Sequence, residues 1–415
     1  MRFIGDFHIH SKYSRATSPT MDLENLDMWA KVKGIDVLGT GDFTHPLWFE
    51  EIEKKLSPAE PGLFKLNKSN SPIRFVLSSE VSCIYSKNGK VRKVHIVILS
   101  PSLEACKKIN FELDKIGNID SDGRPILGMD AKDLAKVVFN ANENCMVIPA
   151  HIWTPWFAVF GSKSGFDSLE ECFEEYTNKI FAVETGLSSD PAMNWRLSQL
   201  DEVCLISNSD AHSPRKLGRE ANVFDTEFSY YGILDAIKNK DPKKFLYTIE
   251  FFPEEGKYHY DGHADCKINL TPQESKKYKN ICPICSKPLT IGVLNRVDSL
   301  ADRPQDFLPK NAIPFKKIIP LEEIIADSLG VGVASKQVDK FYNNMIRELG
   351  NEFKILLDIK EPNLKKHSSE KIADGIIRVR QQKVQIDPGY DGVFGKIKIF
   401  SELKKKKAPK QKSLL

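Results

Sequence analysis

The chain has 415 residues, of which 41% are hydrophobic and 10% aromatic, so it can build a large core in two or three domains and does not have a disordered composition. Its 60 basic and 56 acidic residues leave a net charge of +4, so any surface for a polyanion must be local. We find no signal-peptide pattern and no run of about 18 apolar residues, and we expect a cytoplasmic protein without a membrane segment.

The first part of the chain, up to residue 252, repeats a pattern in which a short apolar run ends in a polar residue. Helix-like stretches lie between several of these runs, at 21–33, 132–142 and 190–200. Continuous apolar runs are typical of strands buried on both faces, and their alternation with helices predicts a parallel α/β architecture. We therefore expect a distorted barrel of about seven strands, with polar side chains gathered at the carboxyl ends of the strands. The runs are 2–7, 35–38, 73–77, 91–99, 145–148, 180–183 and 203–206.

Histidines and carboxylates follow these runs. His8-Ile9-His10 places two imidazoles on one face of a strand, because side chains alternate with period two. Imidazole with carboxylate is the ligand set of zinc, manganese or iron, and so many ligands predict two or three ions that share a bridging carboxylate. Such a site hydrolyses phosphoesters. The histidines are His8, His10, His45, His95, His151 and His212, and the carboxylates are Asp42, Glu80, Glu184 and Asp210.

A second cluster of metal-binding residues lies at 253–297. His263-X2-Cys266, followed by Cys282-X2-Cys285, has the spacing of a zinc ribbon in which a histidine replaces one cysteine. We expect one structural zinc ion there, although His259 competes with His263 as the fourth ligand. The remaining five of the eight cysteines stand in apolar contexts and are predicted to be reduced.

The last part of the chain, 298–400, begins with proline-rich loops and then has a helical pattern from 321 to 357. The glycine-rich segment 329–336 lies between two helical stretches and is typical of a helix–hairpin–helix, which binds a DNA phosphate through backbone N–H groups. We predict that 401–415 is a disordered basic tail. Gln381-Gln382-Lys383 is a candidate contact for a sliding clamp.

The motifs of the first domain together resemble the polymerase and histidinol phosphatase (PHP) family. The resemblance rests on Asp6 to Ser11, Gly41-Asp42, Glu80, His95, His151 and Asp210-Ala211-His212. It implies a distorted (β/α)7-type barrel with one metal on His8, His10, Glu80 and Asp210, and a second on Glu80, His95 and His151. His212 would join a third site with Asp42 or His45. The chain departs from the family where Asp42-Phe43-Thr44-His45 replaces an adjacent Asp-His pair and where Ser14-Arg15-Ala16 lacks the usual ligand.

The order of the modules is similar to that of the endonuclease Q family over nearly the whole chain. The resemblance includes Tyr258 to His263, Cys282 to Leu294 and Pro388 to Gly395. It implies a DNA repair nuclease that cuts 5′ to deaminated bases (hypoxanthine, uracil, xanthine) and abasic sites, with flipping of the lesion. We expect Asp210, Glu80 and His151 to take part in catalysis, with zinc in the structural module and with zinc, manganese or magnesium in the barrel.

Two other functions compete with this one. A PHP-type phosphatase acting on a small substrate such as histidinol phosphate would need only the barrel. A noncatalytic DNA-binding scaffold would need no complete metal site. The aromatic loop after His151, with Trp153, Trp156, Phe157 and Phe160, predicts either core packing or stacking on a base.

Overall fold

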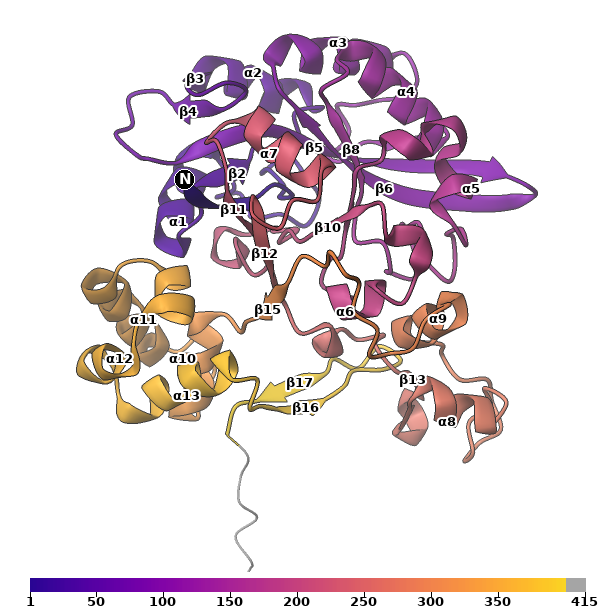
Figure 1. The fold of residues 1–415 in the computed structure, drawn as a ribbon, viewed down its shortest axis with the longest axis vertical. Helices are drawn as coiled ribbons and strands as arrows, with labels where there is room; N and C mark the ends of the chain where they lie inside the picture. The colour runs from indigo at the N-terminus through magenta and orange to yellow at the C-terminus, as the bar shows by residue number, and fades with distance from the viewer. Residues whose placement is uncertain (401–415) are drawn as a thin grey trace, which may run out of the picture.

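Strand β1 (Arg2–Asp6) lies near the middle of the main sheet in this computed structural model, which describes residues 1–400. It pairs in parallel with β2 (Val37–Gly39) and antiparallel with β11 (Ala221–Asp225). The predicted basic tail at 401–415 lies outside the described residues. Figure 1 shows the strands inside the N-terminal body, drawn in indigo to magenta, with helices such as α3 and α4 on its outside.

The sheet continues on both sides of β1, and it is mixed. β2 pairs in parallel with the long strand β5 (Arg74–Lys87), but β5 and β6 (Lys90–Ser100) form an antiparallel hairpin. The α/β class is confirmed, while the wholly parallel sheet is wrong because hairpins and the β1–β11 pair reverse strand direction. The other strands of this body are β3 (Leu56–Pro58), β4 (Phe64–Leu66), β7 (Ile126–Leu127), β8 (Met146–Pro149), β9 (Ala182–Glu184), β10 (Cys204–Ile206), β12 (Phe245–Glu250) and β15 (Phe315–Lys317).

The helices of this body begin and end where local signals place them. In α1 (Leu23–Lys33), the Asp22 side chain accepts a hydrogen bond from the backbone N–H of Asn25, and Gly34 ends the helix with a left-handed φ of 90°. The helices predicted at 21–33 and 132–142 are confirmed, the second as α4 (Ala131–Ala141). The others are α2 (Pro46–Lys55), α3 (Leu103–Asp114), α5 (Leu169–Phe173) and α7 (Tyr230–Lys238).

The helix predicted at 190–200 is interrupted. Only α6 (Pro191–Asn194) and a 3₁₀ turn (Ser198–Leu200) form there. The Asn194 side chain donates to the carbonyl of Asp190 at 2.8 Å, which offers the backbone an alternative to the helical ladder. This buried amide also accepts from the Trp153 indole at 2.7 Å, so tertiary contacts override helical propensity.

The small module after the N-terminal body contains a hairpin and two short helices. Strands β13 (Asp261–His263) and β14 (Ile268–Leu270) pair antiparallel, and α8 (Pro272–Lys277) and α9 (Val293–Leu300) follow. Strands β16 (Gln385–Asp387) and β17 (Lys396–Lys398) form a second hairpin whose tip returns to this module. There Asp391 accepts from the backbone of Ala264 at 2.6 Å. Figure 1 shows this ribbon between the module and the yellow helices.

The C-terminal helices are α10 (Leu321–Leu329), α11 (Lys336–Leu349), a π-helical turn (Lys354–Asp358), α12 (Glu361–His367) and α13 (Glu370–Arg380). A buried ion pair joins them to the N-terminal body: the Lys33 ammonium lies 2.6 Å from Glu352, which also accepts from the Tyr342 hydroxyl. No helix of residues 1–400 is long and apolar enough to cross a membrane.

Candidate metal centres

Two histidines and an aspartate converge at the end of β1. A parallel bridge between Ile9 and Ala211 brings the segment after β1 beside the one that carries Asp210. Asp210 Oδ1 lies 3.7 Å from His8 Nε2 and 3.2 Å from His10 Nε2. These three atoms are buried and make no hydrogen bond within residues 1–400. Buried polar atoms normally have a partner, so their convergence fits a shared cation.

Glu80, in the middle of β5, joins this group to a second one. Its Oε2 lies 3.6 Å from His8 Nε2 and 3.3 Å from His10 Nε2. Its Oε1 lies 2.9 Å from His95 Nδ1 and 3.3 Å from His151 Nε2. Glu80 therefore stands between two groups of ligand atoms, as a carboxylate that bridges two ions would.

Three of the predicted site residues have an unusual backbone conformation. Asp42, His151 and Asp210 have φ values of 49°, 30° and 47°. Residues other than glycine rarely adopt a positive φ, and such backbone strain concentrates at functional sites. Beside His151, a Cβ on Gly186 would lie 2.5 Å from the His151 Cβ, so only glycine fits there.

Two carboxylates lie within hydrogen-bond distance of the Nδ1 atoms of His8 and His10. Asp42 Oδ1 lies 3.0 Å from His10 Nδ1, and Glu184 Oε1 lies 3.0 Å from His8 Nδ1. A carboxylate that accepts from Nδ1–H fixes the proton there, which directs the lone pair of Nε2 toward a metal. Asp42 and Glu184 therefore contact the Nδ1 atoms of the predicted ligands His10 and His8, and these contacts orient the two rings.

The charges of the group also suit cations. Burial alone would raise the pKa of the Glu80 carboxyl. The electrostatic effect of His95 and His8 lowers it by more, so this pKa lies well below its ordinary value. Burial lowers the pKa of His95 to about 4, which keeps its imidazole neutral as a ligand must be. Imidazole nitrogens together with carboxylate oxygens are a donor set that fits zinc or manganese.

The residues predicted for a third metal do not form a ligand group among residues 1–400. The Asp42 carboxylate makes hydrogen bonds with His10, Ser11 and Ser14. His45 precedes α2 and stacks on Tyr13 with ring centroids 4.5 Å apart. His212 lies beside His10, and its Nδ1 is 2.9 Å from the Asp210 carbonyl. The structure thus brings His212 to the centre and leaves His45 outside it.

Arg124 is a member of the centre that the sequence did not indicate. Its guanidinium donates from Nη1 to Glu80 Oε2 at 3.0 Å. It stands in the Asp122-Gly123-Arg124 turn, 44 residues from its partner, and no motif marks it.

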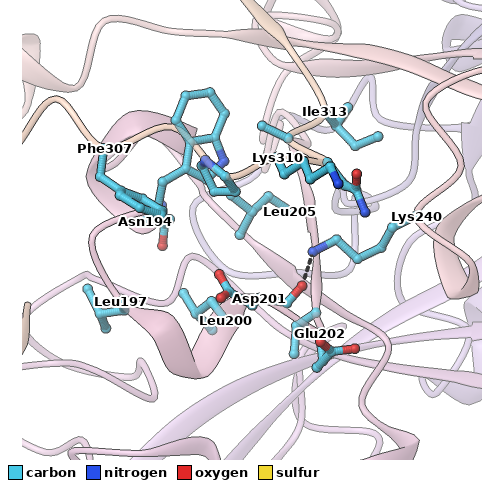
Figure 2. Close-up of a pocket in the computed structure, with 15 residues that line it drawn as sticks. Asn194, Leu197, Leu200, Asp201, Glu202, Leu205, Lys240, Phe307, Lys310 and Ile313 are labelled. Carbon is cyan, nitrogen blue, oxygen red and sulfur yellow. Dashed lines mark hydrogen bonds between the residues drawn. The ribbon is translucent and has the colours of Figure 1, made fainter. Parts of the chain in front are cut away.

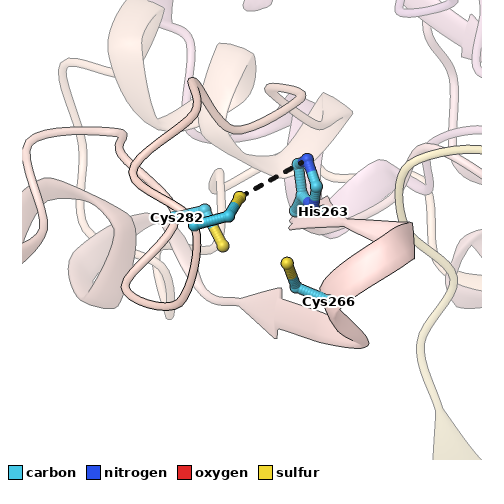
Figure 3. Close-up of side chains that lie close together, drawn as sticks. His263, Cys266 and Cys282 are labelled. Atoms are coloured by element: carbon cyan, nitrogen blue, oxygen red, sulfur yellow. Dashed lines mark hydrogen bonds between the residues drawn. The ribbon is translucent and has the colours of Figure 1, made fainter.

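The four residues predicted for the structural zinc site lie together. One ligand atom from each of His263, Cys266, Cys282 and Cys285 falls within 4.8 Å of the others. Figure 3 shows His263, Cys266 and Cys282 pointing toward one another. His259, the competing ligand, is buried elsewhere and lines a different pocket, and its Nδ1 has no hydrogen-bond partner among residues 1–400. The geometry therefore favours His263.

That pocket opens beside the candidate metal centre and has a volume of about 590 Å³. Its wall includes Thr154, whose hydroxyl lies 3.1 Å from His151 Nδ1, and Arg219, which donates to the carbonyl of Asp210. In the aromatic loop, Trp153 and Phe160 are fully buried in the core, whereas Trp156 is 45% exposed and lines the pocket. The Trp156 ring packs edge-on against the Tyr258 ring, with the two ring centroids 6.3 Å apart.

A smaller cavity of about 230 Å³ has no residue of either metal group in its lining (Figure 2). Leu205, Phe307 and Ile313 form part of its wall, and the Lys240 ammonium donates to the carbonyl of Asp201. None of the predicted site residues lines it.

Solved structures resemble the chain over almost its whole length. The crystal structure of the lesion-specific endonuclease PfuEndoQ from Pyrococcus furiosus has a TM-score of 0.86 and 33% identity, and covers 97% of this chain and 96% of that one. The chain belongs to the endonuclease Q family. A second structure of endonuclease Q, in complex with a 27-mer duplex that has an abasic lesion at the active site, has a TM-score of 0.84.

Other relatives of this endonuclease Q family member are known by sequence. MJ0043 of Methanocaldococcus jannaschii is 34% identical over 253 residues, which span 59% of the chain but only 31% of that protein. YqxK of Bacillus subtilis is 28% identical over 96% of the chain and 99% of its own length. Residues 320–383, which contain α10 to α13, match the family described as the MJ0043 C-terminal domain.

Proposed function

We propose that the chain is a metal-dependent DNA repair endonuclease that hydrolyses the phosphodiester 5′ to deaminated bases and abasic sites. The observation that carries the proposal is Glu80, whose two oxygens face two separate groups of ligand atoms in a protein of the endonuclease Q family. The abasic lesion at the active site of the related complex supports damaged DNA as the substrate.

Different residues of the centre would bind the ions and orient the ligands. His8, His10 and Asp210 would hold one ion and His95 with His151 another, with Glu80 shared between them. Bound divalent ions supply Lewis-acid polarisation of the phosphoryl oxygens and acidify a water nucleophile. Asp42 and Glu184 hold the proton of His10 and His8 on Nδ1, so that both Nε2 atoms remain ligands.

The pocket beside His151 suits a nucleobase turned out of the duplex. Its volume of about 590 Å³ lies in the usual range for small-molecule sites. Trp156, Tyr258 and Phe394 line it and offer aromatic faces for stacking, and Phe394 is 69% exposed. Lys216, Arg219 and Lys257 add positive charge for the backbone phosphates. Turning out a mispaired or missing base costs less than turning out a paired one, which contributes selectivity.

The C-terminal helices supply a second surface for DNA. Gly330 ends α10 with a φ of 69°, and a Cβ at Gly332 would meet nothing within 4 Å, so the turn before α11 is open. Backbone N–H groups at the start of α11 would then bind a phosphate away from the cut, as in a helix–hairpin–helix.

The test is a labelled duplex with one deoxyinosine, incubated with the protein and manganese or magnesium. We expect a single cut on the 5′ side of the lesion and none in the matched duplex with deoxyadenosine. Asp210→Asn should abolish cutting while lesion binding in a gel-shift assay persists. An intact inosine duplex combined with phosphate release from histidinol phosphate would instead favour the small-molecule phosphatase.

A further inference from the structure

The place expected for a third metal is closed by the turn that carries Arg124. Both oxygens of Asp42 are already used: Oδ1 faces His10, and Oδ2 accepts from the Ser11 amide at 2.6 Å and from the Ser14 hydroxyl at 2.9 Å. A Cβ on Gly123 would lie 2.3 Å from Asp42 Oδ2. The backbone of Gly123 therefore packs directly against this carboxylate and leaves no room for an ion there.

The next residue of that turn brings a fixed positive charge to the centre. Arg124 donates to Glu80 Oε2, the oxygen that also faces His8 and His10. The ion pair between Arg15 and Asp122, with N and O atoms 3.2 Å apart, lies in the same region of the surface. A guanidinium keeps its charge at all physiological pH values, so the site has a permanent cation here.

The guanidinium is also placed to meet a substrate. The side chains of His8, His10 and Glu80 are 1% exposed or less, whereas those of Arg124, Asp210 and His212 are 27–30% exposed. These last three therefore form the open side of the centre. Among residues 1–400, the guanidinium makes one hydrogen bond, to Glu80, and its other N–H donors are free for an incoming oxygen.

We propose that Arg124 replaces the third metal ion of the PHP-type site and binds a non-bridging oxygen of the scissile phosphate. The proposal rests on the proposed function for its substrate. A planar guanidinium matches a phosphate with two parallel N–H donors, which a lysine ammonium does not. It forms and breaks no covalent bond, and it stabilises the negative charge that develops on the phosphoryl oxygens as water attacks.

The test compares Arg124→Ala and Arg124→Lys with Arg15→Ala, which removes an 80% exposed cation near the same turn. We expect kcat to fall about 100- to 1,000-fold in Arg124→Ala, a loss typical of one missing oxyanion donor. KM for the duplex should change far less, and Arg124→Lys should recover only part of kcat. Arg15→Ala should behave like the wild type.

Two further measurements separate contact with the phosphate from support of Glu80. Metal content by mass spectrometry should be the same in the wild type and in Arg124→Ala, and added guanidinium chloride at low concentration should restore part of the lost activity of Arg124→Ala alone. An unchanged kcat, a metal loss that parallels the loss of activity, or a third barrel ion in the wild type would each overturn the proposal.

The same variants distinguish this proposal from that for damaged DNA. If the wild type leaves inosine duplexes intact but hydrolyses bis(p-nitrophenyl) phosphate, the lesion nuclease is wrong, and the role of Arg124 is then measured on that ester. A wild-type rate in Arg124→Ala on whichever ester the protein hydrolyses would overturn the role of Arg124 alone.

Discussion

Asp42→Asn provides the sharpest test of how the centre is built, because one atom changes while the size of the side chain is kept. In the wild type, Asp42 accepts on both oxygens, from His10 on one side and from Ser11 and Ser14 on the other. An amide accepts on one side only. If its oxygen faces Ser11, its NH2 points at His10 Nδ1 and moves the imidazole proton to Nε2, which can then no longer bind a metal. If its oxygen faces His10, the buried Ser11 amide loses its acceptor.

Both orientations carry a cost that can be estimated. Loss of the carboxylate partner of a metal-binding histidine lowers metal affinity by about 10- to 100-fold, which corresponds to about 1.4 to 2.8 kcal/mol of binding free energy. A buried N–H without an acceptor destabilises the fold by about 1–3 kcal/mol. We therefore expect weaker metal binding at the His8, His10 and Asp210 group, with the His95 and His151 group little affected.

The assay is a zinc titration of the metal-free protein against a fluorescent chelator, with mass spectrometry for the number of ions bound. His45→Ala is the matched control, since its ring stacks on Tyr13 outside the centre and should leave affinity unchanged. Wild-type affinity and activity in Asp42→Asn would refute the positioning role. A loss of one whole ion, with the remaining affinities unchanged, would instead make Asp42 a direct ligand of a separate metal.

Three other predictions concern the zinc module, the buried ion pair of Lys33 and the buried Glu250. Cys282→Ser should release one zinc ion, measured with a colorimetric chelator, and should increase proteolysis of the hairpin that packs on the zinc module; unchanged zinc content would contradict the site. Glu352→Gln should destabilise the protein by about 3 kcal/mol in urea unfolding because it leaves the buried Lys33 ammonium without a counterion, and the double variant with Lys33→Met should recover much of that loss. Burial raises the pKa of Glu250 to about 8 from 4.5, so the folded state keeps a proton that the unfolded chain releases, and stability should fall as pH rises between these values. The fall is at most about 1.4 kcal/mol per pH unit, and Glu250→Gln should flatten it in thermal melts; an equal slope in both proteins would argue against the buried proton.

Much of the candidate centre could be predicted because its candidate ligands follow local rules. The period of two in a strand places His8 and His10 together, and both are found beside Glu80. Two-residue gaps bring Cys266 and Cys282 into one cluster with their partners. The contact of Asp42 with His10 could not be predicted, because a carboxylate that binds a metal and one that binds a histidine look the same in a sequence.

The amino-acid sequence by itself determined the ligand types, the α/β alternation and the helices with clear end signals, since these depend on side-chain chemistry and on neighbours within a few residues. Only the tertiary structure decided the direction of strand pairing, the choice of His263 over His259, and the arrival of Arg124 at the centre. The physical reason is the large sequence separation between the residues that make these contacts. Contacts such as that of the Asp6 carboxylate with the Gly218 amide, 212 residues away, depend on how the whole sheet closes, and no local propensity encodes them.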